Sequence, residues 1–68
     1  MNLKDYRTKI GKTQAECSKE LDITVVYYSD LERGVFKPSP QLAMQIETWS
    51  QGNIPKSELR PDIWQKAA

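Results

Sequence analysis

The sequence predicts an all-α domain of four to five short helices followed by a short C-terminal tail. Three observations predict this class: helix-capping residues recur along the chain, apolar residues between them follow helical spacing, and glycine follows three of the four stretches. The 68 residues suffice for a single domain over 1–68. A chain of this size buries roughly 60% of its unfolded surface. Its free energy of unfolding should be about 3–10 kcal/mol.

The first predicted helix begins after Asn2, whose side chain can cap free backbone N–H groups of the first turn. Asp5 lies in that turn, where negative charge is favourable, and Gly11 ends the helix. Apolar side chains recur at helical spacing along it, namely Leu3, Tyr6 and Ile10. We therefore expect one buried face.

Residues 13–34 read as two short helices joined by a tight turn. Thr13 and Glu16 form a capping box at the start of the first helix, and Thr24 is the N-cap of the second. Gly34 is a left-handed stop. The inward-facing residues would be Cys17, Leu21, Ile23, Tyr28 and Leu31. Helices this short need a third element to hold them, which favours a helix-turn-helix geometry.

A fourth helix is predicted to begin at Ser39-Pro40, with serine as the cap and proline in the first turn. Gly52 should stop it. Its apolar positions are Leu42, Ala43, Ile46 and Trp49.

The C-terminal segment contains Ile54-Pro55 and Arg60-Pro61, and each proline restricts the residue before it. The stretch Lys56–Leu59 is therefore at most one helical turn. Three apolar residues are expected to dock either on the core or on a partner subunit: Leu59, Ile63 and Trp64.

Composition argues against several classes of protein. Cys17 is the one cysteine, so it cannot form an internal disulfide, and its apolar helix position fits a reduced core residue of a cytoplasmic protein. The sequence has no apolar run long enough for a signal peptide or a membrane span. It also lacks histidine, a Gly-rich phosphate loop and a metal-ligand cluster. We expect no catalysis, no cofactor, no metal and no membrane partner.

Charge is unevenly distributed, although the net charge is only +1. Residues 1–12 carry +3, residues 13–36 carry −3 and residues 37–68, with Lys66, carry +1. A basic N-terminal helix beside an acidic centre is a weak electrostatic footprint for nucleic acid.

The chain resembles the helix-turn-helix family of phage repressor and Cro proteins. It is similar above all to small prophage regulators that end in Leu-Arg-Pro-Asp-Ile-Trp, here 59–64. The matching positions are Thr13-Gln14, Leu21, Ile23-Thr24, Leu31-Glu32-Arg33-Gly34 and Pro38-Ser39-Pro40. The resemblance implies a lambda-repressor-like fold and a sequence-specific transcriptional regulator. It further implies a Cro- or CI-type repressor that binds a palindromic operator on double-stranded DNA as a homodimer.

In such proteins the second helix of the motif enters the major groove. Gln14 would donate a hydrogen bond to a phosphate, and Tyr27 would lie at the edge of the groove. Lys37 and Arg33 would reach the DNA backbone. The full set of DNA contacts that the resemblance implies is Gln14, Thr24, Val25, Val26, Tyr27, Ser29, Asp30, Arg33 and Lys37. Gln14 could instead be a helix-start residue on the surface.

The expected base-reading face departs from the family pattern, because Gln, Asn and Arg are absent from residues 25–30. Val25 and Val26 can contact thymine methyl groups, unless one of them enters the core. Ser29 can bond any base. Asp30 could accept from a cytosine amino group, or it could pair with Arg33 at i, i+3.

Two further positions depart from the family. Asp22 takes a turn position where glycine is usual, and aspartate tolerates the left-handed region better than most residues. Tyr28 stands where Ile or Val is usual. We expect its ring inside and its hydroxyl at an edge, where a polar partner is available.

The resemblance also implies a structural ion pair between Arg7 and Glu32, with a direct phosphate contact by Arg7 as the alternative. The candidates for a dimer interface are Trp49, Ile63 and Trp64, which could equally be core residues. A second class of function stays open, a protein-interaction module on the same scaffold, such as an antitoxin. The acidic motif and its exposed apolar stretch favour that alternative.

Overall fold

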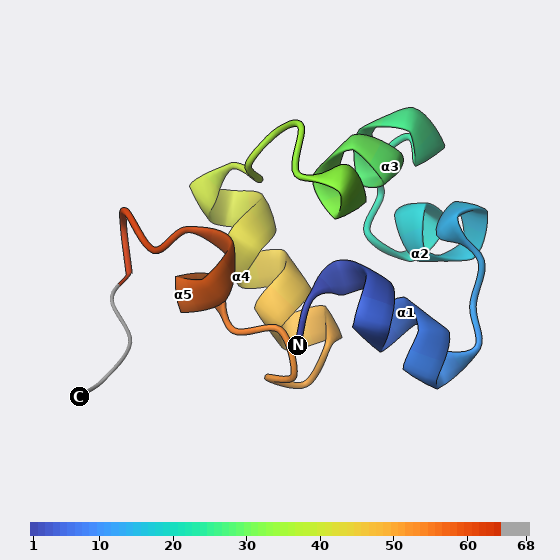
Figure 1. Cartoon of the computed structure of the whole chain (residues 1–68), viewed down its shortest axis with the longest axis horizontal. Coiled ribbons are helices and arrows are strands. Elements are labelled where there is room, and N and C mark those ends of the chain that lie inside the picture. Colours follow the sequence, from blue (N-terminus) through green and yellow to red (C-terminus); the bar gives the residue numbers. More distant parts are fainter. Residues whose placement is uncertain (65–68) are drawn as a thin grey trace.

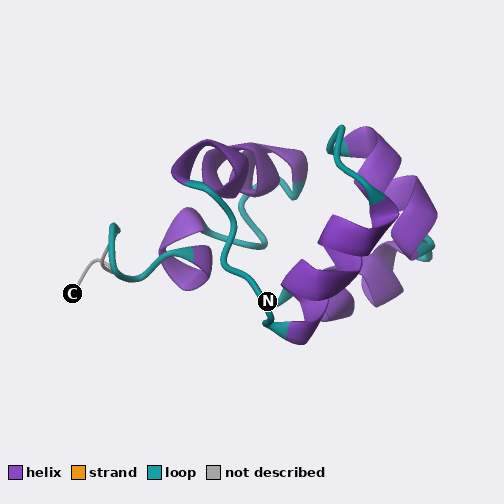
Figure 2. Cartoon of the chain, turned by 90° about the horizontal axis from the view of Figure 1, so that it is seen from above, coloured by secondary structure: helices purple, strands orange, loops and turns teal. Residues whose placement is uncertain are grey.

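The computed structural model describes residues 1–64, and Lys66, counted above in the C-terminal charge, lies outside them. The described residues form five helices and no strands, so the predicted all-α class is confirmed (Figure 1). The helices are α1 (Leu3–Ile10), α2 (Gln14–Glu20), α3 (Val25–Arg33), α4 (Pro40–Trp49) and α5 (Lys56–Leu59). The first three form one half of the molecule, and α4 with α5 forms the other (Figure 2).

The helix starts form where capping residues predict them. Asn2 Oδ1 accepts from the Asp5 N–H at 2.8 Å, and Thr24 Oγ1 accepts from the Tyr27 N–H at 3.1 Å. The capping box is present in both directions, with contacts of 2.9 and 3.1 Å between Thr13 and Glu16. Ser39 Oγ accepts from the Leu42 N–H at 3.2 Å. These bonds satisfy N–H groups that a helix cannot pair internally.

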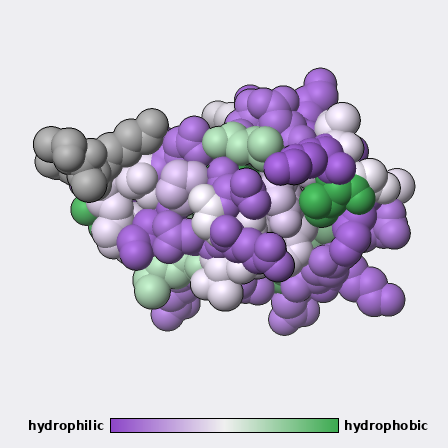
Figure 3. All heavy atoms as spheres, turned by 90° about the horizontal axis from the view of Figure 1, so that it is seen from below, coloured by the Kyte–Doolittle hydropathy of each residue, from purple (hydrophilic) through white to green (hydrophobic). Residues whose placement is uncertain are grey.

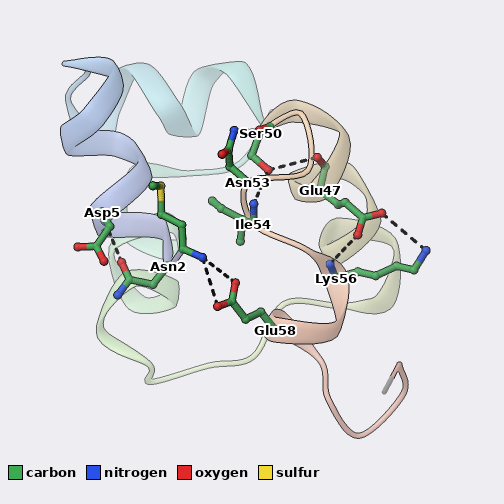
Figure 4. Close-up of polar contacts among 9 residues, drawn as sticks. Asn2, Asp5, Glu47, Ser50, Asn53, Ile54, Lys56 and Glu58 are labelled. Carbon is green, nitrogen blue, oxygen red and sulfur yellow. Dashed lines mark hydrogen bonds and ion pairs between the residues drawn. The ribbon is translucent and has the colours of Figure 1, made fainter. Parts of the chain in front are cut away.

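The end of α4 differs from the prediction. The helix stops at Trp49 rather than at Gly52, and Gln51 already has a left-handed φ of 55°. The buried Ser50 hydroxyl explains the early stop, because it accepts from the Ile54 N–H at 3.0 Å and draws the chain away from the helix axis (Figure 4). Glu47 Oε2 then accepts from the Lys56 N–H at 2.9 Å, which holds the start of α5 against α4.

One apolar core joins all of α1 to α4 with the connector before α5. Its buried members are Leu3, Tyr6, Cys17, Leu21, Tyr28, Leu31, Leu42, Ala43, Ile46 and Ile54. The apolar stripes of the sequence predict nine of them. Ile54 is fully buried although it lies in an irregular segment, where helical spacing gives no signal.

Trp49 closes one side of this core from within the same chain. Its ring meets Tyr6 edge-on, with centroids 5.1 Å apart and an interplanar angle of 69°. Its Nε1 donates to Glu20 Oε1 at 3.0 Å, and Lys12 Nζ lies 2.6 Å from Glu20 Oε2. The half-buried indole therefore links α1, α2 and α4.

The C-terminal segment is held by polar contacts and by Leu59, which packs against the core. The Met1 ammonium lies 3.0 Å from Glu58 Oε2, and Arg60 Nη1 donates to the Pro38 carbonyl at 2.9 Å. Trp64 is half-buried, with Lys56 Nζ 5.6 Å from its ring centroid, whereas Ile63 remains exposed. Docking on the core, one of the two expectations for this segment, holds for Leu59, whereas Ile63 is 44% exposed and is not part of the core.

Candidate nucleic-acid interface

The helix α3 has one buried side and one free side. Tyr28 and Leu31 anchor it in the core, and it packs against both α1 and α2. Val26 and Arg33 lie about two turns apart on the opposite side of the helix. Val26 is 68% exposed, and 65% of the Arg33 side-chain surface is exposed. The arrangement leaves the outer face of α3 unpartnered within the described chain.

Both valines at the start of α3 point outward. Val25 is 44% exposed, so the alternative in which one of the pair enters the core is wrong. Inward positions are already filled by Ile23 and Tyr28, and the helical turn carries Val25 and Val26 past them. The start of α3 is consequently an apolar surface.

The polar groups of this face are mostly engaged. Asp30 pairs with Arg33 at i, i+3, and only 17% of the Asp30 side chain is exposed. The Thr24 hydroxyl serves as the helix cap, and Ser29 and Tyr27 are half-buried. Asp30 thus forms the i, i+3 ion pair with Arg33 that the sequence offered as the alternative to a base contact.

The expected phosphate contacts lie at the two ends of the motif. Gln14 is the first residue of α2 and is half-buried, while Lys37 is exposed in the connector between α3 and α4. Lys37 makes no ion pair with the described residues, so its charge is available to an anion.

Two exposed apolar residues near Lys37 lie outside the set of predicted DNA contacts. Val35 and Phe36 directly follow α3 and are 55% and 56% exposed. The signal that could have identified them is a pair of large apolar residues inside a connector rich in Pro, Gly and Ser. By contrast, the side of the molecule seen from below, away from α3, is mainly hydrophilic (Figure 3).

An ion pair holds α3 against α1. Arg7 Nε lies 2.8 Å from Glu32 Oε2, and Arg7 Nη2 lies 3.2 Å from Oε1. Burial is the largest influence on Glu32, whose side chain is 5% exposed, and it would raise the pKa of the carboxyl group. The hydrogen bond and charge of Arg7, together with neighbouring polar side chains, outweigh burial, so the pKa is lowered. Gln14 acts on that carboxylate in the same direction, which places its amide near the pair.

Tyr28 departs from its expected position. Its ring and its hydroxyl are both fully buried, and the hydroxyl has no hydrogen-bond partner among residues 1–64, so the expectation of an edge location is wrong. The hydroxyl lies toward Cys17 and Glu32, and burial raises the pKa of both Tyr28 and Cys17. Packing of the ring in the centre of the core outweighs the cost of the unpaired hydroxyl.

Asp22 adopts the left-handed conformation that the turn was expected to require, with a φ of 58°. The Asp22 N–H donates to the Lys19 carbonyl at 3.2 Å and the Ile23 N–H to the Ser18 carbonyl at 2.9 Å, which closes the turn between α2 and α3. This turn sets the angle at which α3 leaves α2.

A short helix crossed by a second helix with a free outer face defines the helix-turn-helix class of DNA-binding transcription regulators. The family model for the helix-turn-helix matches residues 3–48, and the chain belongs to that family. With α1 to α4, its fold is lambda-repressor-like. The family is one of DNA-binding regulators rather than enzymes. No curated protein and no solved structure matches the chain. Within residues 1–64, no helix has the length and apolar character needed to cross a membrane.

Proposed function

We propose that this chain is a sequence-specific transcription regulator of the Cro or CI type, acting as a single domain that places α3 in the major groove. The observation that carries the proposal is the two-sided construction of α3. Its inner side is buried, while Val26 and Arg33 are exposed on the outer side. A helix held rigidly with one face open is what major-groove recognition requires.

Contacts to the DNA phosphate backbone would lie on either side of α3, the helix proposed to enter the major groove. Gln14 at the start of α2 and Lys37 after α3 lie at opposite ends of the motif, and Arg33 occupies the last turn of α3. Tyr27 would lie at the edge of the groove, where its hydroxyl can contact the DNA backbone. Contacts of this kind fix the register of the helix on the duplex without reading sequence.

The regulator is proposed to bind as a homodimer on a palindromic operator, because two-fold symmetry allows two short helices to share one site. Ile63 remains exposed and Trp64 half-buried next to α5, which keeps both available to a second copy. Trp49 is a weaker candidate, since its indole already bonds Glu20 and packs on Tyr6. The half-sites should lie about one or more helical turns apart, in steps of roughly 34 Å.

In vitro selection of bound duplexes followed by sequencing tests this function. We expect an inverted repeat whose half-site spacing reports the dimer. On the selected duplex, three phosphates neutralised per subunit would give a slope of log affinity against log salt of about −5. Failure to enrich any sequence, or a slope near zero, would contradict the proposal.

The competing function is a protein-interaction module, such as an antitoxin. The exposed apolar residues at the start of α3 and just beyond its end favour it. Val25, Val26, Val35 and Phe36 are all more than two-fifths exposed. An apolar surface of this kind can mark a protein-binding site. A folded protein that enriches no duplex in the selection would support this alternative.

A further inference from the structure

We infer that α3 recognises the 5-methyl groups of pyrimidines, and that Val25 and Val26 are the residues that do so. The protein would then recognise its operator by the positions of methyl groups in the major groove. Hydrogen bonds to the base edges would contribute less. The inference rests on the proposed function, and it names the chemical feature of the DNA that the function requires.

The first argument is the chemistry of the two side chains. Val26 is the most exposed large apolar residue described, and Val25 stands beside it on the first turn of α3. Neither can donate or accept a hydrogen bond. The apolar group that a base pair presents in the major groove is the C5-methyl of thymine, and 5-methylcytosine carries a methyl on the same ring carbon.

The second argument is that the polar side chains on this face are either paired or partly covered. The Asp30 carboxylate pairs with Arg33 through Oδ1 and its side chain is only 17% exposed, so little of it is presented to a cytosine amino group. The Thr24 hydroxyl accepts the cap bond from the Tyr27 N–H, and Ser29 is half-buried. The valines are therefore the groups on α3 best placed to distinguish one base from another.

A specific ranking of bases follows. A valine that contacts C5 does not sense whether position 4 of the ring carries a keto or an amino group. Thymine and 5-methylcytosine should bind alike, and uracil and unmethylated cytosine should both bind more weakly. Each methyl removed from contact should lower affinity about fourfold.

The test uses the duplex enriched by selection, with one modified base at a time. Each thymine of a half-site is replaced by deoxyuridine, and the same positions are then compared as cytosine and as 5-methylcytosine. Affinity is measured for the unaltered protein and for Val25→Ala, Val26→Ala and Val35→Ala. Val35→Ala is the matched control, because Val35 is equally apolar and 55% exposed but lies beyond the end of α3.

We expect one or two thymines per half-site at which deoxyuridine weakens binding about fourfold and 5-methylcytosine restores what cytosine loses. Val25→Ala or Val26→Ala should abolish that dependence at its own position, while Val35→Ala keeps it. Equal binding of thymine and uracil duplexes at every position would overturn the inference and leave the proposed function intact. Methyl dependence that persists in both valine variants would also overturn it. If selection enriches no duplex, the proposed function and this inference fail together.

Discussion

Arg7 and Glu32 face each other through two parallel contacts, of 2.8 Å from Nε and 3.2 Å from Nη2. The pair joins the middle of α1 to the last turn of α3, and Arg7 Nη1 also donates to the Lys12 carbonyl at 3.3 Å. A bidentate pair fixes direction as well as distance. The angle of α3 is therefore set on its buried side, away from the exposed face that we propose meets DNA.

Replacing Glu32 with alanine should destabilise the fold by about 3 kcal/mol. The estimate takes the low end of the usual 3–5 kcal/mol for breaking a buried pair. One-fifth of the Arg7 side chain is exposed, so water can partly hydrate the guanidinium left behind. Urea unfolding measures the change, with Asp5→Ala at the exposed first turn of α1 as a control for loss of one carboxylate. A loss below about 1 kcal/mol would show that the pair contributes little.

Stability should fall as the solution becomes acidic, and Glu32 should be a main cause. Its pKa is lower in the folded protein than the ordinary value of 4.5, so the folded state favours the carboxylate. The resulting stabilisation is complete above about pH 5 and is lost as pH falls through 4.5 toward the folded value. Glu32→Gln should flatten this part of the pH profile in urea unfolding. The exposed Asp62, whose pKa is lowered to about 2 by Arg60, would still titrate. An unchanged profile in Glu32→Gln would contradict the assignment.

Tyr28→Phe should stabilise the protein by about 1 kcal/mol, because it removes a buried hydroxyl that has no partner among the described residues and leaves the ring in place. In a domain of this size such a gain raises the midpoint of thermal unfolding by about 4–8 °C. Tyr27→Phe, at a half-buried position, serves as the control and should change little. A lower midpoint for Tyr28→Phe would mean that the hydroxyl does form a hydrogen bond. The candidate partners are the side chains of Cys17 and Glu32, toward which the hydroxyl lies.

Asp22→Gly should raise the free energy of unfolding by about 0.5–1 kcal/mol, since glycine adopts a φ of 58° without steric cost. Asp22→Ala should give no such gain, because alanine keeps the Cβ that disfavours a positive φ. Thermal unfolding of both variants compares them directly. Equal stability of the two would show that the turn holds no strain at this residue.

Local features of the sequence predicted most of the fold. Asn2, Thr13, Thr24 and Ser39 act as caps through bonds that span three residues, and such bonds depend on little beyond the local chain. Helical spacing likewise predicted the buried stripes. What spacing could not predict was Ile54, whose burial depends on a hydrogen bond between its backbone and the Ser50 side chain.

The recognition surface was predicted less completely, for a physical reason. For Val25 and Val26 the sequence allowed either a base contact or a place in the core, and only the packing of α3 against α1 and α2 decides that both are exposed. Asp30 was compatible with a base contact and with Arg33, and three-dimensional packing selected the second. The hydroxyl of Tyr28 lies inside because the neighbouring elements close over it, which no local pattern reveals.

Chemical-shift mapping of the backbone amides during titration with the selected palindromic duplex tests the central claim most directly. The measurement locates the surface of this protein that meets DNA. We predict the largest changes at Gln14, Val25, Val26, Ser29 and Lys37, with small changes at Ile54 and along α5, and weaker changes with a random duplex. Perturbations confined to α4 and α5, or none at all at concentrations that saturate binding, would contradict the claim that α3 is the reading helix.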